Sequence, residues 1–406
     1  MTAPWLTIIG MGEGGYGSIA PKALMALDKA RHVFAPQRLA ETLDLSGKTV
    51  EVWGTPFSDS VEKLMARRGE PTTILATGDP MHFGVGATLA KRLEPGEMHV
   101  LPAPSAFSLA AARMGWPLQD VDCVSLHGRD IDLLNPHVVP GNRILALTSD
   151  GAAVEAVAAL LAARGHGGSR LAVLGRMGGA TESRVDVIAK DAASQAPFDD
   201  FNTLAIECVA DAHAPLVATV PGLDDHLYVH DGQMTKSAVR AVTVAALAPY
   251  AGALLWDVGA GCGSVAIEWM RAARNARAIA IERYDDRLAT IERNARRLGV
   301  PGIEIVRGTA PEALKGLEAP DAVFIGGGIT RENVFEIAWE ALKGGGLLVA
   351  NVVTLEGEAR LTELSRAHGG QMTRIAVSHV EPVGGYHGWR PAMPVTQWRV
   401  RKGGGA

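Results

Sequence analysis

The stretch at residues 254–263 constrains the fold of this chain more strongly than its overall composition does. It reads Leu-Leu-Trp-Asp-Val-Gly-Ala-Gly-Cys-Gly, an apolar run that ends at Asp257 and then turns through Gly259, Gly261 and Gly263. The residues that follow place apolar side chains at helical spacing. A strand, a glycine turn and a helix open a nucleotide-binding α/β unit, in which glycines let the backbone turn tightly and approach a ligand. The motif by itself fits either a dinucleotide or S-adenosylmethionine (SAM).

A carboxylate at the end of the next expected strand helps to separate these two ligands. Glu282 closes the run Arg-Ala-Ile-Ala-Ile-Glu, where an acid accepts hydrogen bonds from ribose hydroxyls. Dinucleotide enzymes use an acid in the same way, but their glycine pattern is Gly-x-Gly-x-x-Gly. Here Gly259, Gly261 and Gly263 follow Gly-x-Gly-x-Gly. This combination favours SAM, and an α/β turn that binds no ligand is the alternative.

Composition sets the broad class of the protein. The chain has 406 residues, 47% of them apolar and 20% charged, which is enough for two or three domains that each bury a core. The formal net charge of −5 argues against nucleic acid as a partner. The sequence shows no signal-peptide pattern and no run of about 18 apolar residues, so we expect a cytoplasmic protein with no membrane segment. No disulfide or metal site is expected, because the three cysteines are widely spaced and form no CxxC pair.

Strands and helices alternate through the first half of the chain, which predicts a largely parallel sheet with ligands at the carboxyl ends of its strands. The apolar runs expected to form strands lie at residues 5–9, 32–36, 71–80, 98–105, 143–148, 171–174 and 202–209. The first of these runs continues into the glycine cluster Gly-Met-Gly-Glu-Gly-Gly. No acid closes the second run to hold a ribose, so a dinucleotide site is doubtful there. A glycine turn that only permits tight packing is the alternative.

Three segments of this half, taken in order, resemble the tetrapyrrole methylase family. They are Gly-Met-Gly-Glu-Gly at residues 10–14, Thr-Gly-Asp-Pro at 77–80 and Pro-Ala-Pro-Ser-Ala-Phe at 102–107, and the resemblance spans roughly residues 4–210. Members of that family methylate precorrin and uroporphyrinogen carbons and bind folded SAM between two α/β subdomains. The resemblance implies SAM contacts at Gly10, Gly78, Asp79, Pro80, Ser105 and Ala106.

The same resemblance extends to other positions near strand ends. It implies further SAM contacts at Thr148 and Ala205. Residues 126–130, Leu-His-Gly-Arg-Asp, are similar to a substrate-side loop of the family. His127 and Arg129 would then contact substrate carboxylates, and a solvent-facing turn is the alternative.

A turn-rich segment without sustained periodicity separates the two halves. We expect a linker at residues 213–231, between one domain at 1–212 and a second at 232–406. The histidines and aspartates of the linker match no helix-borne metal-ligand spacing, so we expect no metal site there. Thr235 is placed to cap the first helix of the second domain.

The second half resembles the class I methyltransferase fold, and more narrowly the decarboxylating precorrin-6B methyltransferases. The resemblance rests on Asp-Gly-Gln-Met-Thr-Lys at residues 231–236, the glycine motif, Glu282-Arg283 and Gly-Thr-Ala-Pro-Glu-Ala-Leu at 308–314. Many relatives carry Asp where this chain has Glu282, and either residue supplies a carboxylate for the ribose. The resemblance implies SAM contacts at Thr235, Asp257, Gly259, Gly261, Gly263, Glu282 and Ala310.

Together, the halves resemble the bifunctional precorrin methyltransferases of cobalamin (vitamin B12) biosynthesis. The implied fold is α/β throughout: an N-terminal tetrapyrrole methylase (class III) with two α/β subdomains, followed by a class I Rossmann-like SAM methyltransferase domain. The implied enzyme uses SAM at two sites. Its N-terminal half methylates C-5 of a precorrin-6 intermediate. Its C-terminal half methylates C-15 and removes CO2 from the C-12 acetate, which gives precorrin-8. Homologous single-domain proteins suggest a homo-oligomer.

The chemistry asks for substrate anchors and one proton donor rather than a Ser-His-Asp apparatus, because a methyl sulfonium needs alignment and exclusion of water. Candidates in or beside the glycine- and aromatic-rich loop at residues 381–390, which we expect over the macrocycle, are His379, Tyr386, His387 and Arg390. Surface-loop roles are the alternative for each. A methyltransferase acting on RNA or protein, and a SAM- or tetrapyrrole-binding scaffold without turnover, remain alternative functions.

Overall fold

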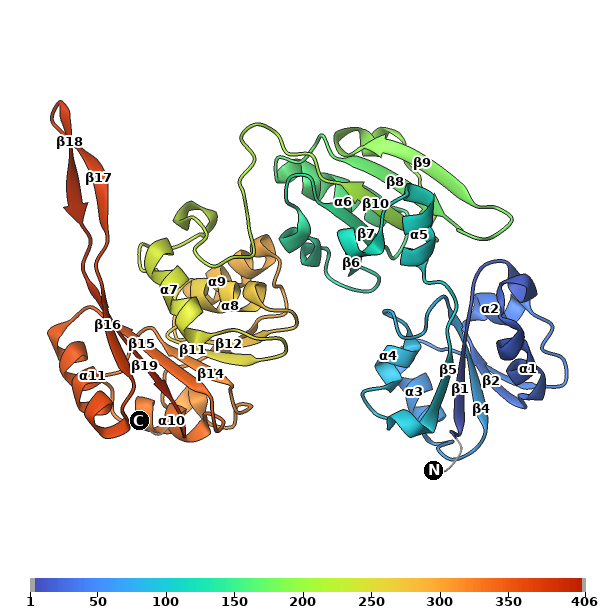
Figure 1. Cartoon of the computed structure of the whole chain (residues 1–406), viewed down its shortest axis with the longest axis horizontal. Coiled ribbons are helices and arrows are strands. Elements are labelled where there is room, and N and C mark those ends of the chain that lie inside the picture. The colour runs from blue at the N-terminus through green and yellow to red at the C-terminus, as the bar shows by residue number, and fades with distance from the viewer. Residues whose placement is uncertain (1–3, 404–406) are drawn as a thin grey trace. The chain divides into compact units, whose positions relative to one another are not determined.

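The computed structural model describes residues 4–403 and divides the chain into two compact units. One unit comprises Met1–Ile131 and His137–Pro215, and the other comprises Asp132–Pro136 and Leu216–Ala406. Figure 1 shows the α/β character of both. The expected α/β class is confirmed. Within residues 4–403, no helix combines the length and the apolarity that crossing a bilayer would need.

The N-terminal unit begins with a parallel five-stranded sheet in the order β3-β2-β4-β1-β5. Two apolar clusters fill the two sides of this sheet, because side chains alternate between the faces of a strand. Ile9 of β1 belongs to the cluster with α1 and α2, and Ile8 belongs to the cluster with α3 and α4. The strands are β1 (Leu6–Met11), β2 (His32–Ala35), β3 (Thr49–Val52), β4 (Thr72–Thr77) and β5 (Met98–Leu101). The helices are α1 (Pro21–Lys29), α2 (Gln37–Thr42), α3 (Phe57–Met65) and α4 (Val85–Leu89).

The second sheet of this unit is mixed, so the expectation of a largely parallel sheet is wrong here. Its order is β6-β7-β10-β8-β9, and β10 runs antiparallel to both of its neighbours. The strand β9 is exposed and alternates charged with apolar residues, so it carries no apolar run that the sequence could reveal. The elements are β6 (Asp122–Ser125), β7 (Arg143–Leu147), β8 (Arg170–Gly175), β9 (Ser183–Ile188), β10 (Asn202–Glu207), α5 (Ala106–Met114) and α6 (Ala152–Ala163).

The C-terminal unit is built on a seven-stranded sheet in the order β13-β12-β11-β14-β15-β19-β16. The first five strands in this order are parallel, and the strand sequence reverses direction between β11 and β14, which is where open α/β sheets bind ligands. Helices α7, α8 and α9 pack in one core, and α10 and α11 pack in the other.

The bounds of the parallel strands are β11 (Leu254–Val258), β12 (Arg277–Glu282), β13 (Glu304–Arg307), β14 (Ala322–Ile325) and β15 (Leu347–Val352). The two antiparallel strands are β16 (Gln371–Ile375) and β19 (Val395–Arg401). The helices are α7 (Ser237–Leu247), α8 (Ser264–Ala272), α9 (Asp285–Leu298), α10 (Val334–Ala341) and α11 (Leu355–His368).

A two-stranded ribbon of β17 (Ser378–Val383) and β18 (Tyr386–Pro391) leaves this sheet between β16 and β19. In Figure 1 it extends away from the body of the unit as a long arm. Two glycines join its strands, a hairpin signal that our reading of this segment as a loop missed.

Part of the expected linker belongs to the C-terminal unit. Leu223, Leu227 and Tyr228 are buried in the core beside α7 and α8. The guanidinium of Arg271 donates to the carbonyl of Val217 at 2.9 Å. The boundary between the two compact units therefore falls at Pro215, not at residue 232. The sequence did not show this, because in this segment isolated apolar residues pack irregular backbone into the core and leave no helical or strand periodicity.

Candidate active site

The glycine turn after β11 has the backbone conformation that only glycine adopts without strain. Gly259, Gly261 and Gly263 have φ angles of 76°, 60° and 79°. A Cβ on Gly259 would lie 3.4 Å from the backbone nitrogen of Gly327, so the loops after β11 and β14 approach closely. The helix α8 begins directly after this turn. The predicted strand, turn and helix are therefore present.

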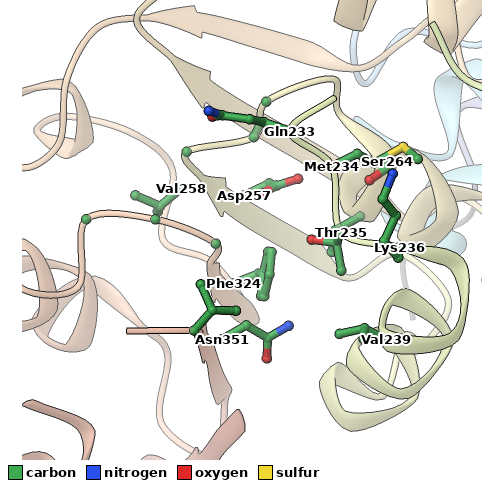
Figure 2. Close-up of a pocket in the computed structure, with 18 of the residues that line it drawn as sticks. Gln233, Met234, Thr235, Lys236, Val239, Asp257, Val258, Ser264, Phe324 and Asn351 are labelled. Atoms are coloured by element: carbon green, nitrogen blue, oxygen red, sulfur yellow. The ribbon is translucent and has the colours of Figure 1, made fainter. Parts of the chain in front are cut away.

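This turn borders a cavity of about 1150 Å³ in the C-terminal unit. Figure 2 shows Thr235, Asp257, Phe324 and Asn351 arranged around it. The predicted SAM-site residues that line it are Thr235, Asp257, Gly259, Gly261, Glu282 and Ala310. Gly263 is absent from the lining, and a Cβ there would lie 3.0 Å from Ile291, so this glycine makes room for helix packing.

Glu282 joins two of the loops around the cavity. One carboxylate oxygen accepts a hydrogen bond from the backbone amide of Gly261 at 3.0 Å. The other accepts from the amides of Arg283 at 2.8 Å and Tyr284 at 3.2 Å. Carboxylate oxygens have further lone pairs, so this buried group can also accept from ribose hydroxyls.

Asp257 is a buried carboxylate with one oxygen that has no hydrogen-bond partner. Its Oδ2 accepts from the amide of Ala266 in α8 at 3.0 Å, whereas Oδ1 has no hydrogen-bond partner. Burial raises the pKa of Asp257 to about 7, the bond from Ala266 opposes this rise, and the charge of Glu282 adds to it. A buried acceptor without a hydrogen-bond partner is uncommon in proteins, and a cationic group of a ligand in the cavity would supply the missing donor.

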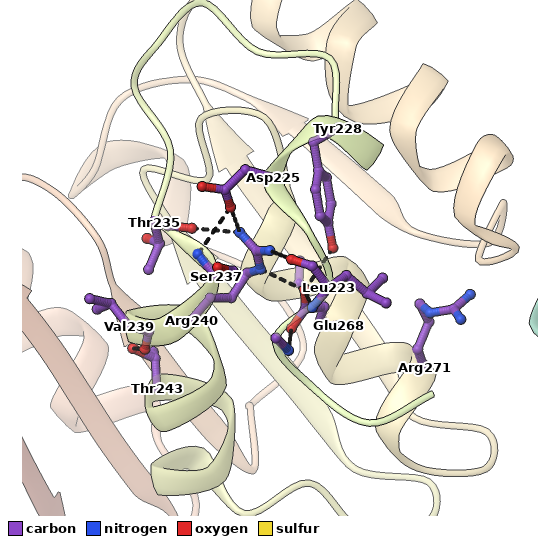
Figure 3. A network of polar contacts seen from close by, with 12 residues as sticks. Leu223, Asp225, Tyr228, Thr235, Ser237, Val239, Arg240, Thr243, Glu268 and Arg271 are labelled. Atoms are coloured by element: carbon purple, nitrogen blue, oxygen red, sulfur yellow. Dashed lines mark hydrogen bonds and ion pairs between the residues drawn. The ribbon is translucent and has the colours of Figure 1, made fainter. Parts of the chain in front are cut away.

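The part of the cavity wall that includes Thr235 and Lys236 is held by a buried ionic network that the sequence did not reveal (Figure 3). Arg240 is fully buried and donates through Nε to Glu268 at 2.5 Å and through Nη1 to the carbonyl of Thr235 at 2.6 Å. The remaining donors of this guanidinium reach Asp225 and the carbonyl of Leu223.

Glu268 receives bonds from several elements at once. Its carboxylate accepts from the Tyr228 hydroxyl at 3.0 Å and from the amides of Gly222 and Leu223. Burial raises the pKa of Tyr228, so its hydroxyl stays a donor. The available signal was charged residues within otherwise apolar helices, namely Arg240 in α7, and Glu268 and Arg271 in α8. Thr235 was expected to cap α7, but Lys236 occupies the cap position without a side-chain bond, and Thr235 contributes its carbonyl to Arg240 instead.

The structure brings one of the four catalytic candidates to the cavity. His379 lines it, and Tyr386, His387 and Arg390 do not. Tyr386 is 83% exposed near the tip of the ribbon, and Arg390 pairs with Glu381 across it at 2.9 Å. The glycine-rich segment therefore forms a hairpin arm, because its alternating residues pair as strands, and does not lie over the cavity as a loop.

In the N-terminal unit, predicted site residues meet where three parallel strands end. A Cβ on Gly10 would lie 2.1 Å from the carbonyl oxygen of Gly78 and 2.6 Å from the nitrogen of Ala103, so only glycine fits at this contact. Gly78 has a φ of 63° and packs against Ser105, next to Ala106. Ser105 is the N-cap of α5 and accepts from the amide of Ser108 at 3.1 Å.

The other N-terminal candidates have partners within the protein. Asp79 accepts from the amide of Met81 at 2.8 Å, and the backbone of Pro80 packs against Gly84. The hydroxyl of Thr148 is buried and donates to Asn202 at 2.8 Å.

Ala205 is fully buried in β10, in the core under α5. The ring of His127 lies 3.1 Å from the carbonyl of Thr148, and the guanidinium of Arg129 lies 5.5 Å from the ring centre of Phe83. In this structure the side chains of Thr148 and Ala205 therefore contact other residues of the same sheet and its core.

Comparison with known proteins supports the two-part organisation of the chain. The tetrapyrrole (corrin/porphyrin) methylase family matches residues 5–193, and the precorrin methyltransferase domain family matches residues 226–402. A precorrin-6Y C(5,15)-methyltransferase [decarboxylating] from Sinorhizobium sp is 48% identical over 404 residues, covering 99% of this chain and 98% of the relative. A relative of the same name from Mycobacterium tuberculosis is 36% identical and covers 98% of this chain and all of its own length.

A solved structure is also similar to part of this chain. The C-terminal domain of precorrin-6Y C5,15-methyltransferase from Rhodobacter capsulatus is 47% identical, covers 46% of this chain and 100% of its own, and has a TM-score of 0.44. The resemblances found in the motifs are confirmed. The chain belongs to the decarboxylating precorrin-6Y C5,15-methyltransferases and is a SAM-dependent methyltransferase.

Proposed function

We propose that this enzyme methylates C-5 and C-15 of a precorrin-6 intermediate and removes CO2 from its C-12 acetate, which gives precorrin-8 in cobalamin biosynthesis. The observation that carries this proposal is the 48% identity to a relative of that name over 99% of this chain. Partial matches confined to one half could not support both reactions, whereas this match spans both.

The proposed division of labour follows the order of the families along the chain. Residues 1–212 would carry out C-5 methylation, and residues 232–406 would carry out C-15 methylation and decarboxylation. Of the segment at 213–231, residues 216–231 belong to the C-terminal unit. Two SAM sites follow from this division. Bound SAM supplies a methyl group activated as a sulfonium.

The C-terminal cavity fits SAM in three respects. The glycine turn leaves room for close approach of the ligand, Glu282 can accept from a ribose, and the free oxygen of Asp257 can accept from a cationic group. The proposed N-terminal site is supported by the close backbone packing of Gly10 and Gly78. The SAM roles of the other predicted residues remain proposals.

The chemistry asks the protein for alignment rather than for a strong acid or nucleophile. The cavity walls hold the reacting carbon in line with the methyl donor and exclude water. Decarboxylation breaks the bond between the acetate CH2 and its carboxylate, and the released electron pair is delocalised into the conjugated ring. The same pair then returns to the CH2 carbon and binds a proton, which completes the methyl group. His379 is the proposed proton donor because it is the catalytic candidate that lines the cavity.

We also propose that the enzyme is a cytoplasmic homo-oligomer without a nucleic-acid partner. The net charge of −5 supports the last point. Large apolar side chains exposed on and beside the ribbon, which include Tyr386 and Trp389, support self-association. Light scattering on the purified chain measures the oligomeric state.

The decisive experiment incubates the purified chain with SAM and precorrin-6B and follows product mass. The expected product has gained two methyl groups and lost CO2. If only one methyl group is ever transferred, one half is inactive or the assignment is wrong. In the Gly259→Val variant, whose added side chain strains the SAM turn, only the C-5 methyl is expected. Transfer of both methyls by that variant would contradict the proposed division.

A further inference from the structure

The C-terminal cavity extends past the methyl-donor site toward the antiparallel side of the sheet. Its volume of about 1150 Å³ exceeds the roughly 300–1,000 Å³ of ordinary small-molecule sites. Glu282 and Ala310 line it from β12 and the loop after β13, on one side of β11. Beyond β14, on the other side, the lining comes from β15, β16, β19 and the base of the ribbon.

This second end has the character of a site for a large apolar ring. Its wall is mostly apolar and includes Ile375, Val377, Met393 and Val395. Met393 is largely exposed, although it lies at the cavity. Apolar side chains that are exposed together beside a cavity are typical of a binding surface, whereas apolar side chains exposed singly elsewhere are not.

Positive charges of the cavity lining are mostly engaged within the protein. Lys236 lies 3.8 Å from Asp225, and Arg287 lies 2.7 Å from Asp231. The guanidinium of Arg283 stacks 4.4 Å from the ring centre of Tyr284.

Arg331 is the exception among the lysines and arginines that line the cavity. Within residues 4–403, its side chain has no hydrogen bond, ion pair or ring contact. It follows the glycine loop after β14, and a Cβ on Gly328 would lie 3.6 Å from its Cδ, so the side chain runs back over that loop. An arginine at a cavity with all its donors free is suited to bind a carboxylate with two parallel hydrogen bonds.

We propose that Arg331 binds a carboxylate side chain of the tetrapyrrole other than the one lost as CO2, while the apolar wall contacts the ring. This inference rests on the proposed function and names a substrate anchor for it. The carboxylate bound by Arg331 must be one that does not react, which we call the spectator carboxylate. An arginine on the reacting carboxylate would stabilise its negative charge in the ground state and so oppose the release of its electron pair into the ring.

The test compares the full-length wild type with Arg331→Met, Arg331→Lys and the control Arg366→Met. Arg366 is an exposed arginine of α11 that does not line the cavity. For Arg331→Met we expect the KM for the tetrapyrrole to rise about tenfold, the size of one lost charge-assisted hydrogen bond. Arg331→Lys should recover part of this loss. Arg366→Met and the affinity for S-adenosylhomocysteine should not change.

The two products separate the spectator role from a role at the reacting group. We expect Arg331→Met to lower CO2 release and C-15 methylation in equal proportion at low substrate concentration. Loss of CO2 release with methylation retained would place Arg331 on the reacting carboxylate and overturn the proposal. An unchanged KM for the tetrapyrrole would also overturn it.

A binding measurement keeps this test independent of turnover. Uroporphyrin, an unreactive polycarboxylate macrocycle, should quench protein fluorescence with about tenfold weaker affinity in Arg331→Met than in Arg366→Met. If the wild type turns over no precorrin but this difference is present, the proposed reaction fails and the carboxylate site stands. If the wild type is active and the variants bind uroporphyrin equally, the anchor is overturned and the reaction stands.

Discussion

The replacement Asp257→Asn should change stability and SAM affinity in opposite directions. Asp257 is 1% exposed, and its Oδ1 has no partner without a ligand. The structure therefore holds a carboxylate whose ionised form is unfavourable in the protein without ligand, and which we propose is stabilised by a cationic group of the ligand. An amide of nearly the same shape removes the charge and retains an acceptor for the Ala266 amide.

The size of the stability effect follows from the pKa of Asp257, which rises from 3.8 to about 7 on burial. Because the folded pKa is raised, the protonated acid favours the folded state, and that contribution is lost as pH rises from about 3.8 to about 7. At 1.36 kcal/mol per pKa unit, the ionised group costs roughly 4 kcal/mol above pH 7. The variant should therefore be more stable than the wild type by about 2 kcal/mol at pH 5 and by roughly 4 kcal/mol at pH 8.

Scanning calorimetry of the full-length chain at pH 5 and pH 8 measures this effect. One unfolding transition should move up in the variant at pH 8, on the order of 10 °C for a unit of this size, and the other should stay. Titration calorimetry should show SAM binding weakened about ten- to hundredfold, because a charge-assisted hydrogen bond is lost. In the wild type, SAM affinity should rise with pH through about 7, whereas the variant should show no such rise.

Two results would refute this reasoning. Equal pH dependence of stability in wild type and variant would show that Asp257 does not carry the buried charge. A variant that is stabilised at pH 8 but binds SAM normally would show that the free oxygen is not used by the ligand. A variant destabilised at both pH values would indicate that the amide disrupts the turn, and the replacement Asp257→Ser would then show whether affinity still depends on pH.

Three further predictions test other parts of the structure. Arg240→Met should destabilise the C-terminal unit by about 3–5 kcal/mol, because it leaves a buried carboxylate unpaired; thermal unfolding measures this, and a shift under 1 kcal/mol would contradict it. Gly10→Val should abolish C-5 methylation and retain C-15 methylation by product mass, because any Cβ there overlaps the Gly78 carbonyl; a doubly methylated product would refute the N-terminal assignment. His387→Ala and Arg390→Ala should leave steady-state decarboxylation unchanged, because neither lines the cavity; a loss above about tenfold, or 1.4 kcal/mol, would return the ribbon to the active site.

Local sequence patterns predicted much of the framework. The strands that end in Asp257-Val258 and in Glu282 lie where their apolar runs placed them. These elements can be predicted locally, because alternating apolar residues, glycine turns and helix caps determine backbone conformation over only a few residues. The same patterns missed β9, the antiparallel placement of β10 and the ribbon, since strand pairing is a long-range choice.

The candidate site divides in the same way. The glycine turn and the ribose acid were visible as a motif, and their grouping at one cavity followed from the strand order. Arg240 and Glu268 were not visible, because their pairing depends on the packing of α7 against α8. Arg390 was a reasonable anchor by type, but only the ribbon's geometry shows that it pairs with Glu381 outside the cavity, while Arg331 lies at it.

By itself, the sequence determined that this protein is a pair of α/β methyltransferase domains, because motifs record local backbone requirements and ordered motifs identify families. Only the tertiary structure decided which charges stay unpaired at the cavity. That property depends on every neighbour that comes within hydrogen-bonding distance. It leaves Asp257 with an oxygen that has no hydrogen-bond partner and Arg331 with free donors, both in the lining of the same cavity.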